Sequence, residues 1–187
     1  MMNYTDEVDK KILHFLSQNP EISQIELSER LKISQPAVSA RIRKLKEKGA
    51  LAYLIGTDIK KAQLFLAKID IATNDTEHFL NFMDKCPIYL NSFLISGRYN
   101  LTVLLIGENM RSIMSCVDSH LRPDPLIKDM EFNLVVTPIR DFIVPLKPVL
   151  DKKKITPCET DCSNCTLYAN NRCLGCPASI DYKGSLL

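Results

Sequence analysis

The sequence lacks the features of a membrane-spanning or exported protein. No apolar run approaches the roughly 20 residues that a transmembrane helix needs. The first residues are polar and acidic, so no signal peptide is evident. The chain nevertheless has seven cysteines, which in the absence of an export signal favour metal or redox chemistry over disulfides. We therefore expect a cytoplasmic protein that makes no membrane contact.

Motifs of common enzyme classes are also missing. The chain has no glycine-rich phosphate loop, no Gly-x-Ser-x-Gly sequence and no His-Glu-x-x-His sequence. The three histidines (His14, His78 and His120) are scattered and indicate no site. We therefore expect a protein that is not an enzyme. The net charge is only +2, so a polyanionic partner would have to be recognised by a local patch.

Such a patch occurs on a helix predicted over residues 34–49. Ser34 is a suitable N-cap, Pro36 fits the first turn, and Gly49 can close the helix in the left-handed conformation. Apolar residues at helical spacing predict a buried stripe formed by Val38, Ile42 and Leu45. Residues 41–48 carry five cations and one acid. Cations on the face away from the buried stripe would suit phosphate groups.

Two shorter helices are predicted before this basic helix. Thr5 can cap the first, whose opening turn is acidic and whose apolar residues have helical spacing. Ser23 and Glu26 have capping-box spacing for the second. A tight turn over residues 31–34 joins the second helix to the basic one, so the pair predicts a helix-turn-helix. The apolar residues 50–55 predict a short strand, or wing, after it.

The middle of the chain predicts alternating strands and helices. Strands are expected at 64–71, 87–96, 101–106 and 131–139, with helices at 75–85 and 109–120. The order βαββαβ is that of the ferredoxin-like arrangement, so the fold class is α+β. The predicted segments are a winged helix-turn-helix domain at 1–56, a linker at 57–63, a ferredoxin-like domain at 64–142, a linker at 143–156 and a cysteine-rich tail at 157–187.

Four short motifs in the first fifty residues belong together. They are Asp-Lys-Lys-Ile-Leu at 9–13, Glu-Leu at 26–27, Leu-x-x-Ser at 31–34 and Arg-x-x-x-Leu-x-x-x-Gly at 41–49. This set resembles the DNA-binding region of the Lrp/AsnC (feast/famine) transcription regulators. The resemblance implies a transcription regulator whose basic helix lies in the major groove of double-stranded DNA.

Positions on the basic helix suggest roles in DNA recognition. Base-edge or groove contacts are assigned to Gln35, Ser39, Ala40 and Arg43. Phosphate contacts are assigned to Arg41, Lys44 and Lys46. The alternative for each cation is a solvated surface side chain.

The sequence Gly97-Arg98-Tyr99-Asn100, which precedes an aliphatic strand, resembles a Gly-x-Tyr/Phe-Asp turn in the effector and assembly domain of the same family. The resemblance implies a homodimer that assembles into a tetramer or octamer. It also implies a small effector, often an amino acid, near this turn. Asn100 stands where the family usually has Asp, and an amide loses the charge pairing with an ammonium group. The four residues are therefore either an effector site or only a β-turn.

The C-terminal segment has no counterpart in the usual family pattern. Five cysteines fall within nineteen residues: Cys158, Cys162, Cys165, Cys173 and Cys176. So short a segment cannot bury a core of its own, and a bound metal would supply the missing folding energy. Two Cys-x-x-Cys pairs could form a zinc site, but the spacer between them is short and one cysteine is left over. Compact spacing and the Cys-Pro sequence at 176–177 suit a [4Fe–4S] cluster better.

Two functional hypotheses follow from these patterns. In the first, the regulator senses redox state, oxygen or iron through an iron–sulfur cluster in the tail. One of Cys158, Cys162 and Cys165 would then be spare. In the second, the regulator responds to an amino acid and the tail holds only a structural Zn²⁺ ion. The remaining cysteines, Cys86 and Cys116, are expected to be small core residues.

Overall fold

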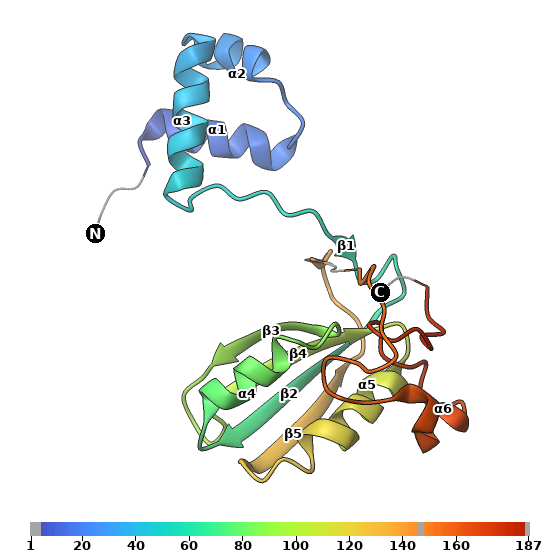
Figure 1. The fold of residues 1–187 in the computed structure, drawn as a ribbon. Helices are drawn as coiled ribbons and strands as arrows, with labels where there is room; N and C mark the ends of the chain where they lie inside the picture. Colours follow the sequence, from blue (N-terminus) through green and yellow to red (C-terminus); the bar gives the residue numbers. More distant parts are fainter. Residues whose placement is uncertain (1–4, 146–147, 186–187) are drawn as a thin grey trace. The chain divides into compact units, whose positions relative to one another are not determined.

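The computed structural model describes residues 5–145 and 148–185 (Figure 1). The outermost residues of the predicted first and last segments, and two residues of the predicted 143–156 linker, lie outside these ranges. The chain divides into two compact units, of which the first ends at Leu54 and the second begins at Ile55. None of the helices in the described ranges is long and apolar enough to cross a membrane.

The first unit is built from three helices around one small core. The helices are α1 (Glu7–Gln18), α2 (Gln24–Leu31) and α3 (Gln35–Glu47). Their facing apolar stripes bury Ile12, Leu16, Ile22, Leu27, Val38, Ile42 and Leu45. Lys32 adopts a left-handed conformation that ends α2, and a short turn then leads into α3. The predicted helix-turn-helix is confirmed.

Short polar side chains begin each of these three helices. Ser23 and Ser34 each accept a hydrogen bond from the backbone N–H three residues further on, as the sequence predicts. The first helix is capped by Asp6 and not by Thr5. Asp6 and Asp9 accept hydrogen bonds from each other's backbone N–H, and this reciprocal capping box starts the helix one residue later than predicted.

The wing predicted at residues 50–55 does not form a strand in this structure. The segment is irregular, and its apolar side chains are largely exposed, at 53% for Tyr53, 57% for Leu54 and 95% for Ile55. An extended segment becomes a strand only when a neighbouring strand satisfies its backbone groups. The apolar composition on which the prediction depended does not supply such a partner.

The second unit contains the predicted βαββαβ order. Its main elements are β2 (Phe65–Thr73), α4 (Thr76–Met83), β3 (Tyr89–Leu94), β4 (Leu101–Gly107), α5 (Met110–Cys116) and β5 (Ile127–Val135). The four strands form one antiparallel sheet in the order β3-β4-β2-β5. The two central strands, β2 and β4, are largely buried, because each has a neighbouring strand on both sides. The ferredoxin-like prediction is confirmed.

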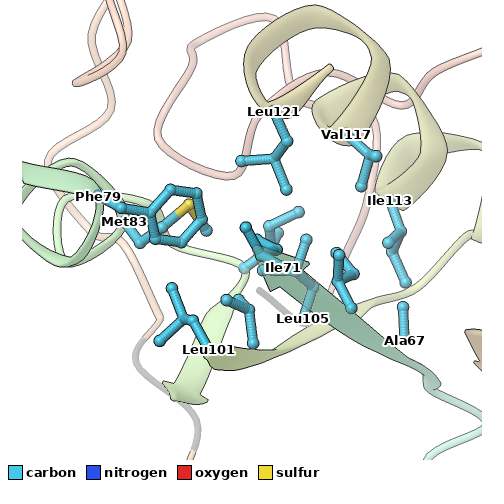
Figure 2. Close-up of a cluster of buried hydrophobic side chains, with 12 residues drawn as sticks. Ala67, Ile71, Phe79, Met83, Leu101, Leu105, Ile113, Val117 and Leu121 are labelled. Carbon is cyan, nitrogen blue, oxygen red and sulfur yellow. The ribbon is translucent and has the colours of Figure 1, made fainter. Parts of the chain in front are cut away.

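Helices α4 and α5 pack on the same face of this sheet (Figures 1 and 2). Phe79 and Met83 of α4 and Ile113 of α5 are fully buried against Ile71 and Leu105 of the sheet. Burial of each such side chain contributes about 1.5–3 kcal/mol to folding. Beyond α5 the chain continues as a π-helical turn, η1 (Val117–Leu121). The packing therefore fixes the position and rotation of α5 and η1.

Segments expected to be linkers contribute to the second unit. β1 (Thr57–Asp58) pairs antiparallel with β6 (Ile143–Val144). Ile59 is 1% exposed and Val144 is 2% exposed, and both pack in one apolar cluster. Burial of these two side chains is the physical reason that the segments at 57–63 and 143–156 are not simple spacers.

The cysteine-rich tail lies against the ferredoxin-like domain (Figure 1). It contains a 3₁₀ turn, η2 (Cys162–Asn164), and a single helical turn, α6 (Thr166–Ala169). The backbone N–H of Leu174 donates to Ser112 Oγ at 2.9 Å. The Tyr182 hydroxyl donates to Glu108 Oε1 at 2.7 Å, and its ring packs on the main core. The tail is therefore attached to the domain by polar and apolar contacts.

Replacement of Tyr182 by phenylalanine tests this attachment. Tyr182→Phe removes the hydroxyl that donates to the Glu108 carboxylate, so we expect the free energy of unfolding to fall by about 1–3 kcal/mol. Chemical denaturation and protease cleavage of the tail measure the effect. Tyr53→Phe in the first unit is the matched control. Wild-type stability and protection in Tyr182→Phe would show that the contact does not hold the tail.

Candidate nucleic-acid interface and cysteine-lined cavity

Helix α3 presents a polar face opposite its buried stripe. Val38, Ile42 and Leu45 face the core of the first unit. Six of the seven residues predicted to contact DNA are exposed: Gln35, Ser39, Ala40, Arg43, Lys44 and Lys46. Exposed small residues allow close approach of a nucleic acid, and the cations next to them suit its phosphates.

The seventh predicted residue, Arg41, has a competing contact within the unit. Its Nη1 lies 2.7 Å from Asp6 Oδ2 and 2.7 Å from Asp9 Oδ1. The side chain of Asp9 is only 8% exposed and that of Arg41 is 33% exposed. Hydrogen bonds with both carboxylates raise the pKa of Arg41. The guanidinium therefore connects α3 to the start of α1, which fixes the orientation of the basic helix.

Two other cations of α3 make weaker contacts that a ligand can replace. Arg43 Nε lies 4.0 Å from Glu47 Oε1, and both side chains are more than two-thirds exposed. Surface pairs of this kind contribute about 0–1 kcal/mol. Lys46 Nζ lies 4.5 Å from the centre of the Tyr53 ring, a cation–π contact at an exposed site. Neither contact prevents these side chains from reaching a phosphate or base.

Residues 97–100 form the connection between β3 and β4. Gly97 has φ 125°, which favours glycine. The Asn100 side chain accepts from Thr73 N at 3.0 Å and donates to Thr73 O at 2.8 Å. Arg98 Nη2 lies 2.7 Å from Asp129 Oδ2. The amide of Asn100 thus joins the turn to β2, which gives it a structural role.

All seven cysteines line one cavity between the tail and the ferredoxin-like domain. The cavity has a volume of about 90 Å³, several times the roughly 10–15 Å³ that one water molecule requires. Domain residues on its wall include Cys86, Cys116 and His120. The tail contributes Cys158, Cys162, Cys165, Cys173 and Cys176. All seven thiols are free of disulfides.

The thiols of this cavity differ in their ionisation. Burial raises the pKa of Cys158, but hydrogen bonds with His120, Thr156 and Thr160 outweigh that effect and bring the pKa down to about 6. Burial raises the pKa of Cys176 to about 12. Cys158 therefore carries a thiolate near neutral pH, and its charge contributes to the high pKa of Cys176.

The domain side of the cavity contains a second interacting pair of thiols. The neighbouring Cys86 thiol raises the pKa of Cys116 well above the usual range, and burial adds to the effect. A hydrogen bond with Cys158 raises the pKa of His120. The sequence interpretation missed these three domain residues, because they are far from the tail in sequence. Only the helical spacing of Cys116 and His120, four residues apart, could have indicated that they share a face.

The donors of the cavity are distributed around its wall. Within residues 5–145 and 148–185, no three His, Cys, Asp or Glu side chains are grouped so that they could hold one metal ion. The backbone N–H of Gly175 donates to Cys173 Sγ at 3.3 Å. Gly175 has φ 88°, and a Cβ there would contact the tail backbone and the Tyr168 ring. This N–H···S contact is of the kind that tunes metal thiolates.

Comparisons with known proteins agree with this architecture. A family model described as winged helix-turn-helix DNA-binding matches residues 5–51. The leucine-responsive regulatory protein of Rhizobium meliloti is 25% identical over 144 residues, which cover 73% of this chain and 92% of that protein. The structure of Escherichia coli AsnC has a TM-score of 0.63 at 16% identity and covers 73% of this chain and 95% of AsnC. The structure of transcriptional regulator NMB0573 of Neisseria meningitidis in complex with L-Met has a TM-score of 0.63 at 22% identity. The match covers 73% of this chain and 92% of NMB0573.

A helix-turn-helix unit with an exposed basic helix, followed by a ferredoxin-like unit, defines a class of DNA-binding transcription regulators. Within that class, the chain is similar to members of the Lrp/AsnC family over about three quarters of its length. Members of the family are transcription regulators, which confirms that the protein is not an enzyme. The matched region leaves about a quarter of the chain uncovered.

Arg41 and Arg43 both lie on α3, but only Arg41 is paired with a buried carboxylate. Arg41→Ala leaves the buried Asp9 carboxylate without its cation, so we expect a loss of about 1–2 kcal/mol, reduced from the full cost of a buried pair because Arg41 is partly exposed. Arg43→Ala is the matched control and should change stability by less than about 0.5 kcal/mol. Hydrogen exchange of the α1 and α3 amides measures both. Equal effects of the two substitutions would contradict a structural role for Arg41.

Proposed function

We propose that the protein is a sequence-specific DNA-binding regulator whose tail holds a [4Fe–4S] cluster and so responds to redox state, oxygen or iron. The observation that carries the proposal is the cavity lined by all seven cysteines on the ferredoxin-like domain. In the tail, Leu174 and Tyr182 contact α5 and the loop before it. A structural change at the cavity would therefore be transmitted to the ferredoxin-like domain.

DNA recognition is assigned to the exposed face of α3. Gln35, Ser39, Ala40 and Arg43 would contact base edges or the groove, and Lys44 and Lys46 would contact phosphates. Gln35 Nε2 donates to Gln24 Oε1 at 3.0 Å, which orients its amide at the start of the helix. Arg41 is assigned a positioning role, because its guanidinium is engaged by two carboxylates.

A cluster fits the chemistry of the cavity better than a single ion does. Its volume of about 90 Å³ is larger than a lone, fully ligated ion requires, and the sulfurs surround it from several segments. In a [4Fe–4S] cluster each cysteine binds a different iron, so the ligands are spread around a core. Cys162, Cys165, Cys173 and Cys176 supply two Cys-x-x-Cys pairs on the tail side. The N–H of Gly175, directed at Cys173, would stabilise a thiolate ligand.

The cluster would couple redox chemistry to the regulator through the docked tail. Reduction or loss of such a cluster would change the charge next to α5 and η1, whose residues line the cavity. Those elements pack on the sheet through Ile113, Val117 and Leu121. A change in their packing would alter the domain through which the family forms assemblies.

The second candidate is an amino-acid-responsive regulator with a structural zinc ion in its tail. It is favoured by the NMB0573 structure, in which the bound molecule is L-Met. The site would involve Gly97, Arg98, Tyr99 and Asn100. Asn100 is already bonded to both backbone groups of Thr73, and Arg98 is paired with Asp129, so little of the turn is left to bind an ammonium or carboxylate group.

The regulator is proposed to act as a homodimer that can assemble further into a tetramer or octamer. β3 is an edge strand, and its apolar residues Phe93 and Leu94 are 49% and 70% exposed. An exposed apolar edge strand is suited to pairing with a second chain. Two copies of α3 in a dimer would reach half-sites about one turn of DNA apart.

The cluster hypothesis predicts a defined metal content. Protein purified without oxygen should contain about four iron atoms per chain and show broad visible absorbance, and the double variant Cys162→Ser/Cys173→Ser should lose both. Ser163→Ala, next to a ligand, is the control and should retain them. Stoichiometric zinc without visible absorbance would reject the cluster and support the second candidate.

The DNA-binding hypothesis predicts different effects for two neighbouring cations of α3. Arg43→Ala should weaken binding to a selected site by about 1–3 kcal/mol and relax base preference there. Lys44→Ala should weaken binding to all sequences alike and reduce the salt slope by about 1. Fluorescence anisotropy with DNA sites selected from a random pool, at several salt concentrations, measures both. Unchanged base preference in Arg43→Ala would remove Arg43 from the recognition set.

A further inference from the structure

Gln24 and Gln35 form a side-chain contact between the two helices of the helix-turn-helix. Gln35 Nε2 donates a hydrogen bond to Gln24 Oε1 at 3.0 Å. We propose that Gln24 is a positioning residue, which fixes the amide of Gln35 for recognition of one adenine in the major groove. This inference rests on the proposed DNA-binding function and extends it to a particular base and to a residue outside α3.

The packing of the two helices places the glutamines next to each other. Gln24 is the first residue of α2, and Gln35 is the first residue of α3. Leu27 and Val38, each three residues further along its helix, are both 0% exposed in the same core. The starting points of α2 and α3 are therefore held together by the fold of the unit. The contact between the two amides does not depend on a loop.

Gln35 begins a row of exposed polar side chains on α3. Ser39 and Arg43 follow it at intervals of four residues, so the three side chains lie along one face of the helix. In helix-turn-helix proteins bound to DNA, the N-terminal residues of the second helix contact base edges. Gln35 occupies that end of the row, which is the position from which its amide could contact a base pair.

An unrestrained glutamine amide can present its donor and its acceptor in either order. A half-turn about the last side-chain bond exchanges the oxygen and the nitrogen, and this bond has little preference between the two positions. The contact with Gln24 removes that freedom in the structure, because Nε2 of Gln35 is turned toward the carbonyl oxygen of Gln24. The Oε1 atom and the second N–H of Gln35 are left in one defined order.

The groups that are left on Gln35 match the edge of an adenine. A glutamine amide pairs with adenine by accepting a hydrogen bond from the N6 amino group and donating one to N7. That pair needs one oxygen and one N–H, which Gln35 retains while its other N–H is bonded to Gln24. Guanine presents two acceptors, N7 and O6, in the same groove, so the Oε1 atom would face another acceptor. We therefore expect an A·T pair at this position of the DNA site.

The same contact would gain in strength when DNA is bound. Gln35 is exposed and Gln24 is half-buried, so water competes for their hydrogen bond in the free protein. A bound duplex excludes that water, which strengthens the bond and makes an unpaired N–H costly. Without Gln24, the amide of Gln35 would be ordered only on binding, and one N–H would be left without its partner. Gln24 thus contributes to base discrimination without contacting the base.

The test selects DNA sites from a random pool with wild-type protein and then measures the preference among the four bases at each position by competition. Gln35→Ala should lower an adenine preference at one position by at least about 5-fold. Gln24→Ala should lower the same preference by about 3- to 10-fold, the equivalent of one hydrogen bond. It should leave the preference that depends on Arg43 unchanged. In a Gln35→Ala background, Gln24→Ala should have no further effect on the adenine preference.

A second variant separates positioning from a general structural role. The side chain in Gln24→Glu can only accept, so it should keep the orientation of Gln35 and the adenine preference. Its negative charge should at the same time weaken binding to all sequences, because it lies near the phosphates. Gln18→Ala, at the exposed end of α1, is the matched control and should retain both affinity and preference. Gln24→Met, which keeps the length of the side chain, replaces Gln24→Ala if that variant does not fold.

Several outcomes would overturn the proposal. They are an unchanged adenine preference in Gln24→Ala, an equal loss of binding to all sequences in that variant, loss of the preference in Gln24→Glu, and a Gln35-dependent position that is not an A·T pair. Wild-type protein that selects no DNA sequence would overturn the DNA-binding function together with this inference. Selection that depends on Arg43 but not on Gln24 would overturn this inference alone.

Discussion

The packing of α5 and η1 on the sheet is the constraint on which the second unit depends. Ile113, Val117 and Leu121 recur every four residues and are all buried against the sheet. Their spacing fixes the rotation of the helix, so that Cys116 and His120 lie beside the buried stripe and line the cavity under the tail. One apolar stripe thus stabilises the domain and also sets the wall of the cavity. The tail, too short to fold around a core of its own, uses that wall as its support.

In the first unit, too, a buried apolar stripe sets which side chains of a helix are exposed. The buried stripe of α3 leaves its small and cationic residues exposed, while the carboxylates of Asp6 and Asp9 hold Arg41. Cations on one helix therefore have two different roles that their charge does not distinguish. Arg41 stabilises the packing of the helix on which Arg43 and Lys44 are exposed. In the function proposed here, the first unit recognises DNA and the second unit carries sensing and assembly.

Local patterns were sufficient where neighbouring residues decide the structure. The caps at Ser23 and Ser34 and the βαββαβ order followed from spacing and composition, and all formed as expected. Predictions were wrong where the structure of a segment depends on a partner that is distant in sequence. The segment at 50–55 is apolar but has no strand beside it in the described chain, and Ile59 and Val144 are buried in segments that looked like spacers. Composition shows which side chains favour burial, but it does not show which part of the chain will pack against them.

The sequence by itself determined the helix-turn-helix, the basic character of its second helix and the soft-donor character of the tail, because each depends on residues within one short segment. Tertiary structure alone decided that Cys86, Cys116 and His120 join the five cysteines of the tail around one cavity. It also decided that Arg41 is engaged inside the first unit. These contacts join residues 32 or more positions apart, and such pairs meet only when the packing of whole helices and strands brings them together.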